Sequence, residues 1–395
     1  PRSPLLDSWC RLRRSVPFDF KSSMIKELHQ NALGMLSCII AIAVVGLVVA
    51  VSCAPPGAGW LALSQQSIHL ILGIVAFVGA YSIPVERIKA SAKGALLLVW
   101  LLLILMLFTS LGEVSNASER WLRIGSFRFQ PSVLYQFFWL IALAHWAAND
   151  PMRLRQGWHI LRLSLVYLLL LIPVFLQPDL GSTVILFVVS AVTLLYAGVP
   201  TRFLKYVGPV LMTLVGLGLL LFPHVSSRFS LLNPGFQVQR SMEAFALGGL
   251  TGRGPGMGVL KHGWLPEGET DFVFALIAEE WGLLGNLVVL GLFVAFTLYG
   301  MRVARRAETR YGAILMASAV VLISLQAAYN MGMVTGILPV KGLPLPFISR
   351  GGTSILVLGG LIGAALRASF ERRQSKVPTE ELIPWTESTA PGSSR

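Results

Sequence analysis

Apolar segments long enough to cross a lipid bilayer recur along the whole chain, and this recurrence limits the possible folds more than any other feature. A helix needs about 20 predominantly apolar residues to span the hydrocarbon core. Only 13% of the 395 residues are charged, roughly half the share found in soluble domains, so a water-exposed surface cannot be built. This excludes collagen-like, disordered, disulfide-stapled and ordinary cytosolic proteins. The sequence predicts an all-α polytopic membrane protein with about ten spans, at residues 32–53, 66–84, 94–112, 131–148, 160–176, 180–199, 203–223, 272–300, 312–336 and 353–370.

The basic residues predict the orientation of these spans. The 32 Lys and Arg outnumber the 19 Asp and Glu and give a formal charge of +13. With a cytoplasmic N-terminus, 23 basic residues lie on the cytoplasmic side and 9 on the outer side, as the positive-inside rule requires. We therefore expect both termini in the cytoplasm. Because the rule accounts for the basic excess, no nucleic-acid partner is expected.

The predicted organisation is one membrane domain with short appendages. A basic cytoplasmic N-terminal segment (1–31) precedes a ten-helix transmembrane domain (32–370), and a cytoplasmic tail (371–395) has the composition of a disordered segment. The outer side carries a large extracytoplasmic loop at 224–271 and a Pro- and Gly-rich loop at 337–352. Long irregular loops tend to carry function, so we expect the chemistry on the outer face.

Asp271 is the first candidate for that chemistry. It ends the large outer loop, directly before the eighth predicted span. The N-terminus of a helix stabilises negative charge, whereas the edge of the apolar slab raises a carboxyl pKa. A base at this level could deprotonate a hydroxyl group of a lipid-linked substrate. The alternative is that Asp271 is an N-cap, a position that Asp commonly occupies.

Glu279 and Glu280 lie inside the same predicted span. Ionisable residues within a membrane are costly and are functional candidates by default. On a continuous helix Glu279 would point about 80° away from Asp271, and Glu280 would point to nearly the opposite face. The alternative is that they pair with an Arg or with backbone groups at a helix interface.

The stretch 119–131 is a predicted outer loop that carries Arg120 beside Trp121. Arg binds phosphate groups through two hydrogen bonds and stays charged, although a single Arg beside Trp is more often an interfacial anchor. Asp179 precedes the sixth span and is a candidate for its N-cap.

A second outer segment, 252–258, is rich in glycine. It lacks the features of a nucleotide-binding loop, and we interpret it as a flexible loop whose backbone amides are free to approach a substrate. The six His residues have no spacing typical of a metal site, so no resident metal is expected.

Several stretches resemble, in order, the SEDS family (shape, elongation, division and sporulation), which includes FtsW and RodA, and the spans match the architecture of that family. The sequence around Lys341-Gly342-Leu343 is more similar to the division branch, FtsW, than to the elongation branch. The stretches that carry the resemblance are Arg120-Trp121-Leu122, Phe129-Gln130-Pro131-Ser132, Gln177-Pro178-Asp179-Leu180-Gly181, Leu265 to Ala275 with Glu279-Glu280, and Gly336 to Gly352.

The resemblance implies a peptidoglycan glycosyltransferase that polymerises lipid II at the outer face of the cytoplasmic (inner) membrane, at the division septum. Asp271 matches the essential aspartate of the family and would act as general base in an inverting transfer. The implied partners are a class B penicillin-binding protein of the FtsI type and divisome regulators. No cofactor is certain, and a divalent cation (Mg or Mn) would accompany the substrate pyrophosphate.

The resemblance also implies roles for further residues, with the segment 236–261 forming part of a substrate groove. The residues expected to bind substrate are Arg120, Asp179, Gln237, Arg253, Lys261, Glu267, Lys341, Ser349 and Arg350. The residues expected to support the site are Glu279, Glu280, Trp121 and Pro131.

Three positions depart from the family pattern. Val133 and Gln136 stand where the family usually has Glu and Lys, and Arg350 stands where Tyr is common. Loss of both charges together avoids an unpaired buried charge. These departures keep two alternatives open, a non-catalytic scaffold that recruits a class B penicillin-binding protein and a lipid II flippase.

Overall fold

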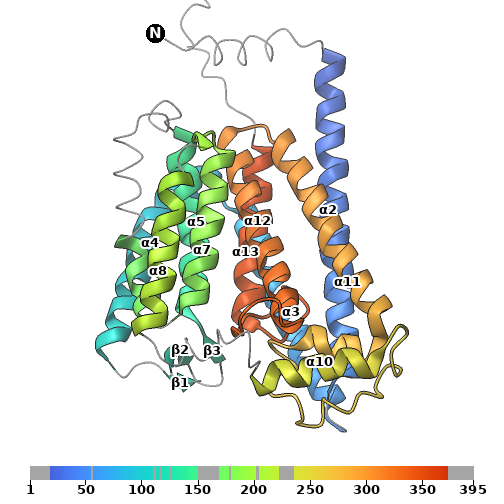
Figure 1. Ribbon diagram of the computed structural model, residues 1–395. Coiled ribbons are helices and arrows are strands. Elements are labelled where there is room, and N and C mark those ends of the chain that lie inside the picture. The colour runs from blue at the N-terminus through green and yellow to red at the C-terminus, as the bar shows by residue number, and fades with distance from the viewer. Residues whose placement is uncertain are drawn as a thin grey trace, which may run out of the picture.

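The protein is a bundle of long helices with two small outer elements at one end (Figure 1). The computed structural model describes residues 18–54, 57–109, 113–115, 118–124, 127–149, 169–177, 179–201, 204–221 and 235–371. The predicted N-terminal segment up to residue 17, the tail from residue 372 and residues 224–234 of the large outer loop lie outside these ranges. The helices are α2 (Phe18–Ser52), α3 (Gly59–Ser82), α4 (Val85–Phe108), α5 (Pro131–Asn149), α7 (Leu180–Tyr196), α8 (Leu204–Leu221), α10 (Phe236–Gly248), α11 (Val273–Arg306), α12 (Arg310–Val334) and α13 (Gly352–Phe370), and residues 169–176 are also helical.

These helices confirm the predicted class of fold. A backbone inside a bilayer must satisfy its own hydrogen bonds, which a helix does within one segment. Within the described residues, six helices are long and apolar enough to span a membrane: α2, α3, α4, α11, α12 and α13. Every predicted span overlaps a helix, the one at 160–176 through residues 169–176. The count of ten spans stays a prediction.

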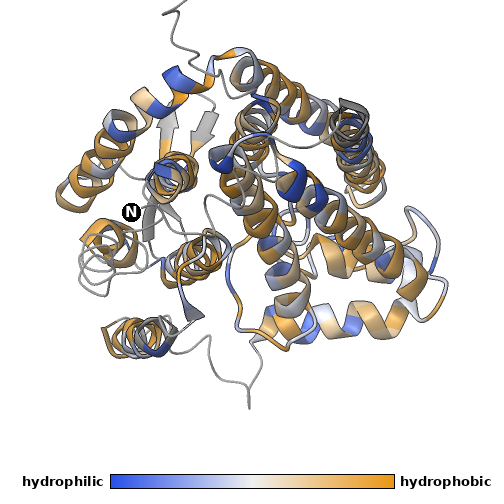
Figure 2. Ribbon diagram, turned by 90° about the horizontal axis from the view of Figure 1, so that it is seen from above, coloured by the Kyte–Doolittle hydropathy of each residue, from blue (hydrophilic) through white to orange (hydrophobic). Residues whose placement is uncertain are grey.

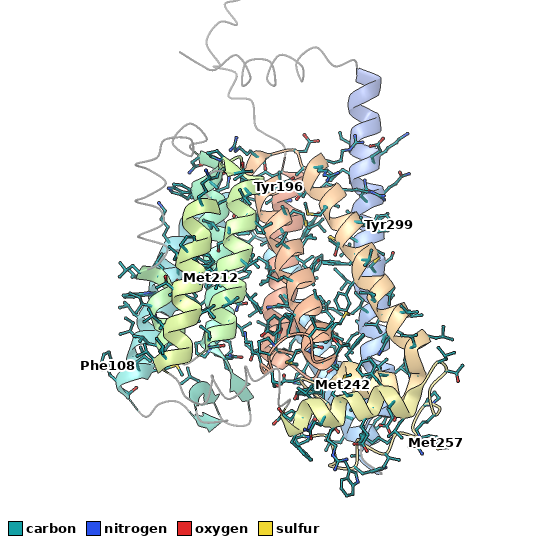
Figure 3. All side chains as sticks on the ribbon, in the orientation of Figure 1. Phe108, Tyr196, Met212, Met242, Met257 and Tyr299 are labelled. Carbon is teal, nitrogen blue, oxygen red and sulfur yellow. The ribbon has the colours of Figure 1, made fainter. Side chains whose placement is uncertain are left out.

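The outward surface of the bundle is apolar. Phe108 on α4 and Met212 on α8 are 83% and 70% exposed and point away from the helices (Figure 3). Viewed from above, apolar residues cover outward-facing turns as well as the interior (Figure 2). Soluble monomers rarely expose apolar surface on this scale. This is the surface of a multi-pass membrane protein whose solvent is lipid.

The two described ends of the chain lie at the same end of the bundle. The ring of His29 near the start of α2 lies 4.7 Å from that of Phe370 at the end of α13. Helix α10 and the strands lie at the opposite end (Figure 1). The arrangement is the one that two cytoplasmic termini require, although the side of the membrane stays a prediction.

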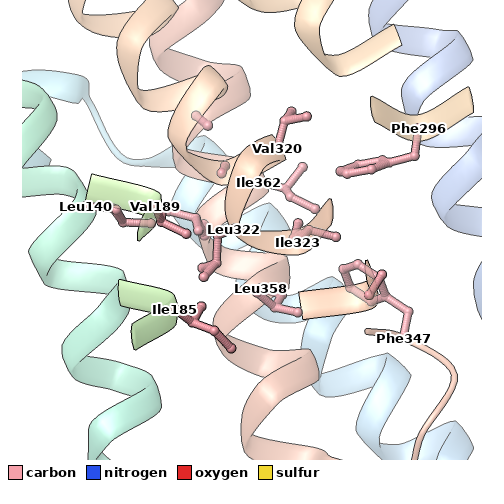
Figure 4. Close-up of a cluster of buried hydrophobic side chains, with 14 of the residues drawn as sticks. Leu140, Ile185, Val189, Phe296, Val320, Leu322, Ile323, Phe347, Leu358 and Ile362 are labelled. Atoms are coloured by element: carbon pink, nitrogen blue, oxygen red, sulfur yellow. The ribbon is translucent and has the colours of Figure 1, made fainter. Parts of the chain in front are cut away.

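The core lies where α7, α11, α12 and α13 meet (Figure 4). Helices α3 and α13 pack backbone against backbone there: a Cβ atom at Gly359 would lie 2.3 Å from the carbonyl oxygen of Gly73. Small residues allow such close approach between membrane helices. Phe347, from the loop that precedes α13, is buried in this core.

The outer stretch 119–131 is not the irregular loop that we predicted. Its chain forms most of a three-stranded antiparallel sheet of β1 (Glu113–Ser115), β2 (Ser118–Ile124) and β3 (Phe127–Phe129). Leu122 pairs with Phe129, and Glu113 pairs with Trp121. Strand β2 begins with three consecutive polar residues, Ser118 to Arg120, so its sequence lacks the polar and apolar alternation that would favour a strand.

The large outer loop also contains regular structure, helix α10. Val238, Ser241, Ala244 and Gly248 are buried at helical spacing, and this face packs against α11. A Cβ atom at Gly248 would lie 1.8 Å from the carbonyl oxygen of Ala278. Glycine at this position therefore lets α10 touch the backbone of α11.

Helix α11 is broken at Gly282, which has φ 68° and ψ −167°. The break removes the two helical bonds that would join Leu283 and Leu284 to the carbonyls of residues 279 and 280. The segment after α10 replaces both bonds: Leu283 and Leu284 donate to the carbonyls of Gly249 and Leu250, at 2.9 and 3.1 Å. In return, the amides of residues 253 and 254 donate to the carbonyls of residues 279 and 280, each at 3.0 Å.

We expect Gly248→Ala to lower the melting temperature of the purified protein. The added methyl group meets backbone atoms that cannot rotate away, and overpacking of this kind typically costs about 1–3 kcal/mol. The matched control is Gly94→Ala on α4, where a Cβ atom meets nothing within 4 Å. Equal melting temperatures for the two variants would contradict the close contact between α10 and α11.

Candidate active site

Asp271 lies between the outer loop and α11 and is held by its backbone. Its amide donates to the carbonyl of Glu267 at 2.9 Å, and its own carbonyl accepts from Nδ2 of Asn330 at 2.7 Å. The N-cap position of α11 belongs to Phe272, so Asp271 is not the N-cap. The side chain is half-buried at the outer end of the helix.

The loop 337–351 packs against this carboxylate. A Cβ atom at Gly342 would lie 2.9 Å from Oδ2 of Asp271, so only glycine permits the observed approach. Nδ2 of Asn330 also donates to the carbonyl of Leu343 at 2.6 Å. The carboxylate therefore faces main chain that is fixed on both sides.

The position of this loop is set by the core. Phe347 is buried among core side chains and has φ 62°, a strained value for a residue other than glycine. Nε2 of Gln66 on α3 donates to the carbonyls of Phe347 and Ile348 at 3.4 and 3.3 Å. Oγ of Ser349 accepts from the amide of Leu345 at 2.8 Å. These contacts make the loop a rigid wall of the site.

Arg350 links this loop to the one that carries Asp271. Its Nη1 atom lies 2.7 Å from Oε2 of Glu269, and its amide donates to the carbonyl of the same residue at 3.4 Å. Glu267, at the start of the turn, has φ 55° and its carbonyl accepts from the amides of residues 270 to 272. Asp271 therefore lies at the end of a tight turn that begins at Glu267 and is held to the loop 337–351 by the contacts of Arg350 with Glu269.

Lys341 brings a second cation to the same wall. Its Nζ atom donates to Oγ of Ser182 at 2.9 Å and lies 3.7 Å from Oδ1 of Asp179. Asp179 is the N-cap of α7, as one of our interpretations expected, because Oδ1 accepts from the amide of Ser182 at 3.1 Å. A Cβ atom at Gly181 would lie 2.0 Å from Cδ of Lys341. Glycine at this position therefore leaves the space through which the Lys341 side chain reaches Asp179.

Glu279 and Glu280 form a separate buried cluster that holds the glycine-rich loop. Oε1 of Glu279 accepts from the amide of Val259 at 2.6 Å and lies 3.8 Å from Nη1 of Arg253. Glu280 accepts from Ser52 and from the amide of Gly256, the latter at 2.9 Å. Both carboxylates thus bind one loop, and the alternative of pairing with Arg and backbone groups is the observed one.

Lys261 completes the cluster. Its Nζ atom lies 2.9 Å from Oε1 of Glu280 and donates to the carbonyl of Ser52 at 2.7 Å. The lysine and glutamate side chains are 5% and 1% exposed.

Our expectation of free backbone amides in segment 252–258 is wrong. The amides of Arg253 and Gly254 donate to carbonyls of the broken helix, and those of Gly256 and Gly258 donate to Glu280. The break supplies acceptors that a continuous helix would not offer. The loop is consequently a packed part of the structure.

The remaining predicted residues are more dispersed. Gln237 is half-buried in the first turn of α10, and Pro131 is buried at the first position of α5. The backbone of Arg120 and Trp121 lies in β2, whereas their side chains lie outside the described part of the structure. Sequence reasoning missed Asn330, which a search for polar residues within predicted spans would have found.

The arrangement suits proton abstraction next to an anionic group. A half-buried carboxylate lies at the start of α11, and Lys341 and Arg350 come from the loop that packs against it. Each cation is paired with a carboxylate, Lys341 with Asp179 and Arg350 with Glu269, and fixed cations in a partly dehydrated site stabilise negative charge that develops beside them. Among the described residues, no group of three or more His, Cys, Asp and Glu is placed to hold a metal ion.

Known proteins are similar to this chain over most of its length. The profile of the family described as "Cell cycle protein", which covers FtsW, RodA and SpoVE, matches residues 28–374. A protein of Geobacter metallireducens named "Probable peptidoglycan glycosyltransferase FtsW" is 34% identical over 363 residues, or 87% of this chain and 96% of the relative. A protein of Marinobacter nauticus with the same name is 36% identical over 340 residues, or 80% of this chain and 82% of the relative.

Solved structures show the same fold. The chain is similar to the crystal structure of the rod shape determining protein RodA of Thermus thermophilus, with a TM-score of 0.66 and 26% identity over 86% of this chain and 97% of that one. It is also similar to a chain in a structure described as "Structural coordination of polymerization and crosslinking by a peptidoglycan synthase complex". That match has a TM-score of 0.69 and 26% identity, and covers 87% and 98% of the two chains.

Proposed function

Since the chain belongs to the FtsW, RodA and SpoVE family of cell cycle proteins, we propose that its peptidoglycan glycosyltransferase activity polymerises lipid II at the outer face of the cytoplasmic membrane. The observation that supports this most directly is the Asp271 carboxylate, held against the backbone of Gly342 at the outer end of the bundle. It is a base at the level where a lipid-linked sugar would lie.

In the proposed mechanism Asp271 accepts the proton of the C4 hydroxyl group of the acceptor sugar. The hydroxyl oxygen attacks the anomeric carbon of the donor as the bond to the lipid pyrophosphate breaks. A single displacement inverts the anomeric centre, so an α-linked donor gives a β-linked glycan. The pyrophosphate leaves as a stable anion, and no protein acid needs to protonate it.

Lys341 and Arg350 are the residues that we propose for the departing pyrophosphate. Both come from the loop against which Asp271 packs, and Arg350 offers a planar group suited to phosphate. A divalent cation, Mg²⁺ or Mn²⁺, would travel with the substrate. Because the described residues hold no ready group of metal ligands, the phosphates would supply most of its coordination.

The proposed partner is a class B penicillin-binding protein of the FtsI type, which would cross-link the nascent strand. The similar structure described as a peptidoglycan synthase complex that coordinates polymerization and crosslinking supports such a pairing. Divisome regulators and a location at the division septum belong to the same proposal, which rests on the similarity to FtsW proteins.

Polymerisation of lipid II by the purified protein tests this function. The protein would be reconstituted in nanodiscs with and without its cognate class B partner, and the glycan strands separated by electrophoresis. We expect long strands from the wild-type complex and none from a mock preparation of cells that lack the gene. A folded complex that makes no strands would overturn the proposal and favour the non-catalytic scaffold.

One observation favours that scaffold as a second candidate. Gln136 on α5 is buried, and its Oε1 atom accepts from Nε2 of Gln326 on α12 at 3.4 Å. A neutral contact thus occupies the position where the family usually has a charged Lys, and Val133 replaces the partner Glu. The interior between α5 and α12 is accordingly less polar than the resemblance implies.

We expect Gln136→Lys alone to destabilise the protein and Val133→Glu to offset much of that loss. An unpaired buried charge costs about 3–5 kcal/mol, whereas Glu and Lys three residues apart on a helix can pair. Melting temperatures of the two single variants and the double variant measure the coupling. Strictly additive losses would contradict an ion pair at this site.

A further inference from the structure

We propose that Asn330 is a positioning residue that holds the Asp271 carboxylate in place for glycosyl transfer, an inference that rests on the function proposed above. Asn330 is fully buried in α12. The two hydrogen atoms of its Nδ2 group reach two carbonyls, that of Asp271 at 2.7 Å and that of Leu343 at 2.6 Å. One amide group therefore ties together the two loops that form the site.

The two hydrogen bonds of Asn330 fix the distance between the Asp271 carboxylate and the backbone of Gly342. Leu343 directly follows Gly342, whose Cα hydrogen faces Oδ2 of Asp271 so closely that a Cβ atom there would lie 2.9 Å away. If Gly342 and Leu343 move relative to Asp271, the carboxylate loses this contact and turns. A shift of about 1 Å in the position of a reacting group can cost about 10²-fold in rate.

The energetics favour a dedicated role for this side chain. A buried amide in an apolar helix is costly unless it is hydrogen-bonded, and both donors of Asn330 are used on these carbonyls. Its Oδ1 atom has no hydrogen-bond partner among the described residues. The contribution of Asn330 to the structure therefore comes from the two hydrogen bonds that its Nδ2 group donates. Helix α12 is long and most of its residues are buried, which makes it a rigid support for the Asn330 side chain.

The neighbouring residue offers a matched control. The hydroxyl group of Tyr329 donates to the carbonyl of Pro339 at 3.1 Å. It thus anchors the loop 337–351 to α12, as Asn330 does, but it makes this bond without engaging the segment that carries Asp271. Tyr329→Phe removes one bond to the loop and leaves the tie between the loops intact.

The test compares Asn330→Ala and Asn330→Leu with Tyr329→Phe in nanodiscs. Neither Ala nor Leu donates a hydrogen bond, and Leu fills the space that Asn330 leaves. We expect kcat for lipid II polymerisation to fall by about 10²-fold in both Asn330 variants with KM unchanged, whereas Tyr329→Phe keeps the wild-type kcat. Gly342→Ala, which pushes the carboxylate from the other side, should show the same loss of kcat while Asn330 is intact.

Hydrogen exchange measured by mass spectrometry gives a readout that needs no activity. Asn330→Ala should raise exchange in the peptides that cover 265–272 and 337–351, whereas Tyr329→Phe should raise it only in the second. Unchanged exchange in both loops, or a kcat loss in Asn330 variants no larger than in Tyr329→Phe, would overturn the proposal. A wild-type protein that makes no strands would refute the proposed function, and the exchange data would still decide whether Asn330 ties the loops together.

Discussion

Asp271→Asn should abolish glycan polymerisation while the protein remains folded. The amide has nearly the shape of the carboxylate but cannot accept the proton of the attacking hydroxyl group, and general base catalysis typically contributes about 10²–10⁴-fold. The backbone bonds that hold residue 271, from its amide to Glu267 and from Asn330 to its carbonyl, do not depend on the side chain. We therefore expect an unchanged melting temperature and unchanged binding of lipid II.

The measurement is strand synthesis by the variant complex at equal protein concentration. Glu86→Gln is a suitable control because it makes the same chemical change in a side chain that is 78% exposed on α4, at the other end of the bundle. Strands of wild-type amount and length from a folded Asp271→Asn complex would remove Asp271 from the role of base. Loss of strands together with loss of the folded state would instead indicate a structural role.

Glu280→Ala should be among the most destabilising single substitutions in the outer half of the protein. It leaves the Lys261 ammonium group buried without its carboxylate, a change that typically costs about 3–5 kcal/mol. It also removes the acceptor for the amides of Gly256 and Gly258. The melting temperature, followed by the intrinsic fluorescence of the tryptophans, should therefore fall steeply.

Two further variants separate the charge from the packing. Glu243→Ala removes a carboxylate from an exposed ion pair with Arg240 on α10, and exposed pairs contribute only about 0–1 kcal/mol. The double variant Glu280→Ala with Lys261→Met removes both buried charges and should be more stable than Glu280→Ala alone. A double variant that is less stable than the single one would show that the ion pair is not the source of the effect.

Patterns local to the chain predicted the class of fold and the place of Asp271. Apolar segments of bilayer length are sufficient to predict where helices form, because a helix in lipid is stabilised within its own segment. Asp179 as the N-cap of α7 follows from the same local logic. Residue roles taken from the resemblance, including Asp271 as base, stay predictions.

Contacts between distant segments could not be predicted. The residues around Gly282 do not distinguish a helix break from a glycine that a continuous helix tolerates. The break is stabilised by hydrogen bonds from the segment that follows α10, which is distant in the sequence. The path of Lys341 toward Asp179 depends on the packing of a loop against α7. Strand β2 was missed because a short outer stretch with charged residues is ambiguous between loop and strand.

The break in α11 makes the outer region tolerant of sequence change in a specific way. The four backbone bonds across Gly282 close residues 249 to 284 into a ring, with Asp271 inside it. Because these bonds join main-chain atoms, exposed side chains in the ring can be exchanged without moving the bonded segments, provided that Gly248, Gly252 and Gly282 keep their space and the buried cluster of Lys261, Glu279 and Glu280 is retained. Substitutions on the exposed part of the ring could thus change the surface that surrounds Asp271, while the backbone bonds keep the position of residue 271 relative to α11.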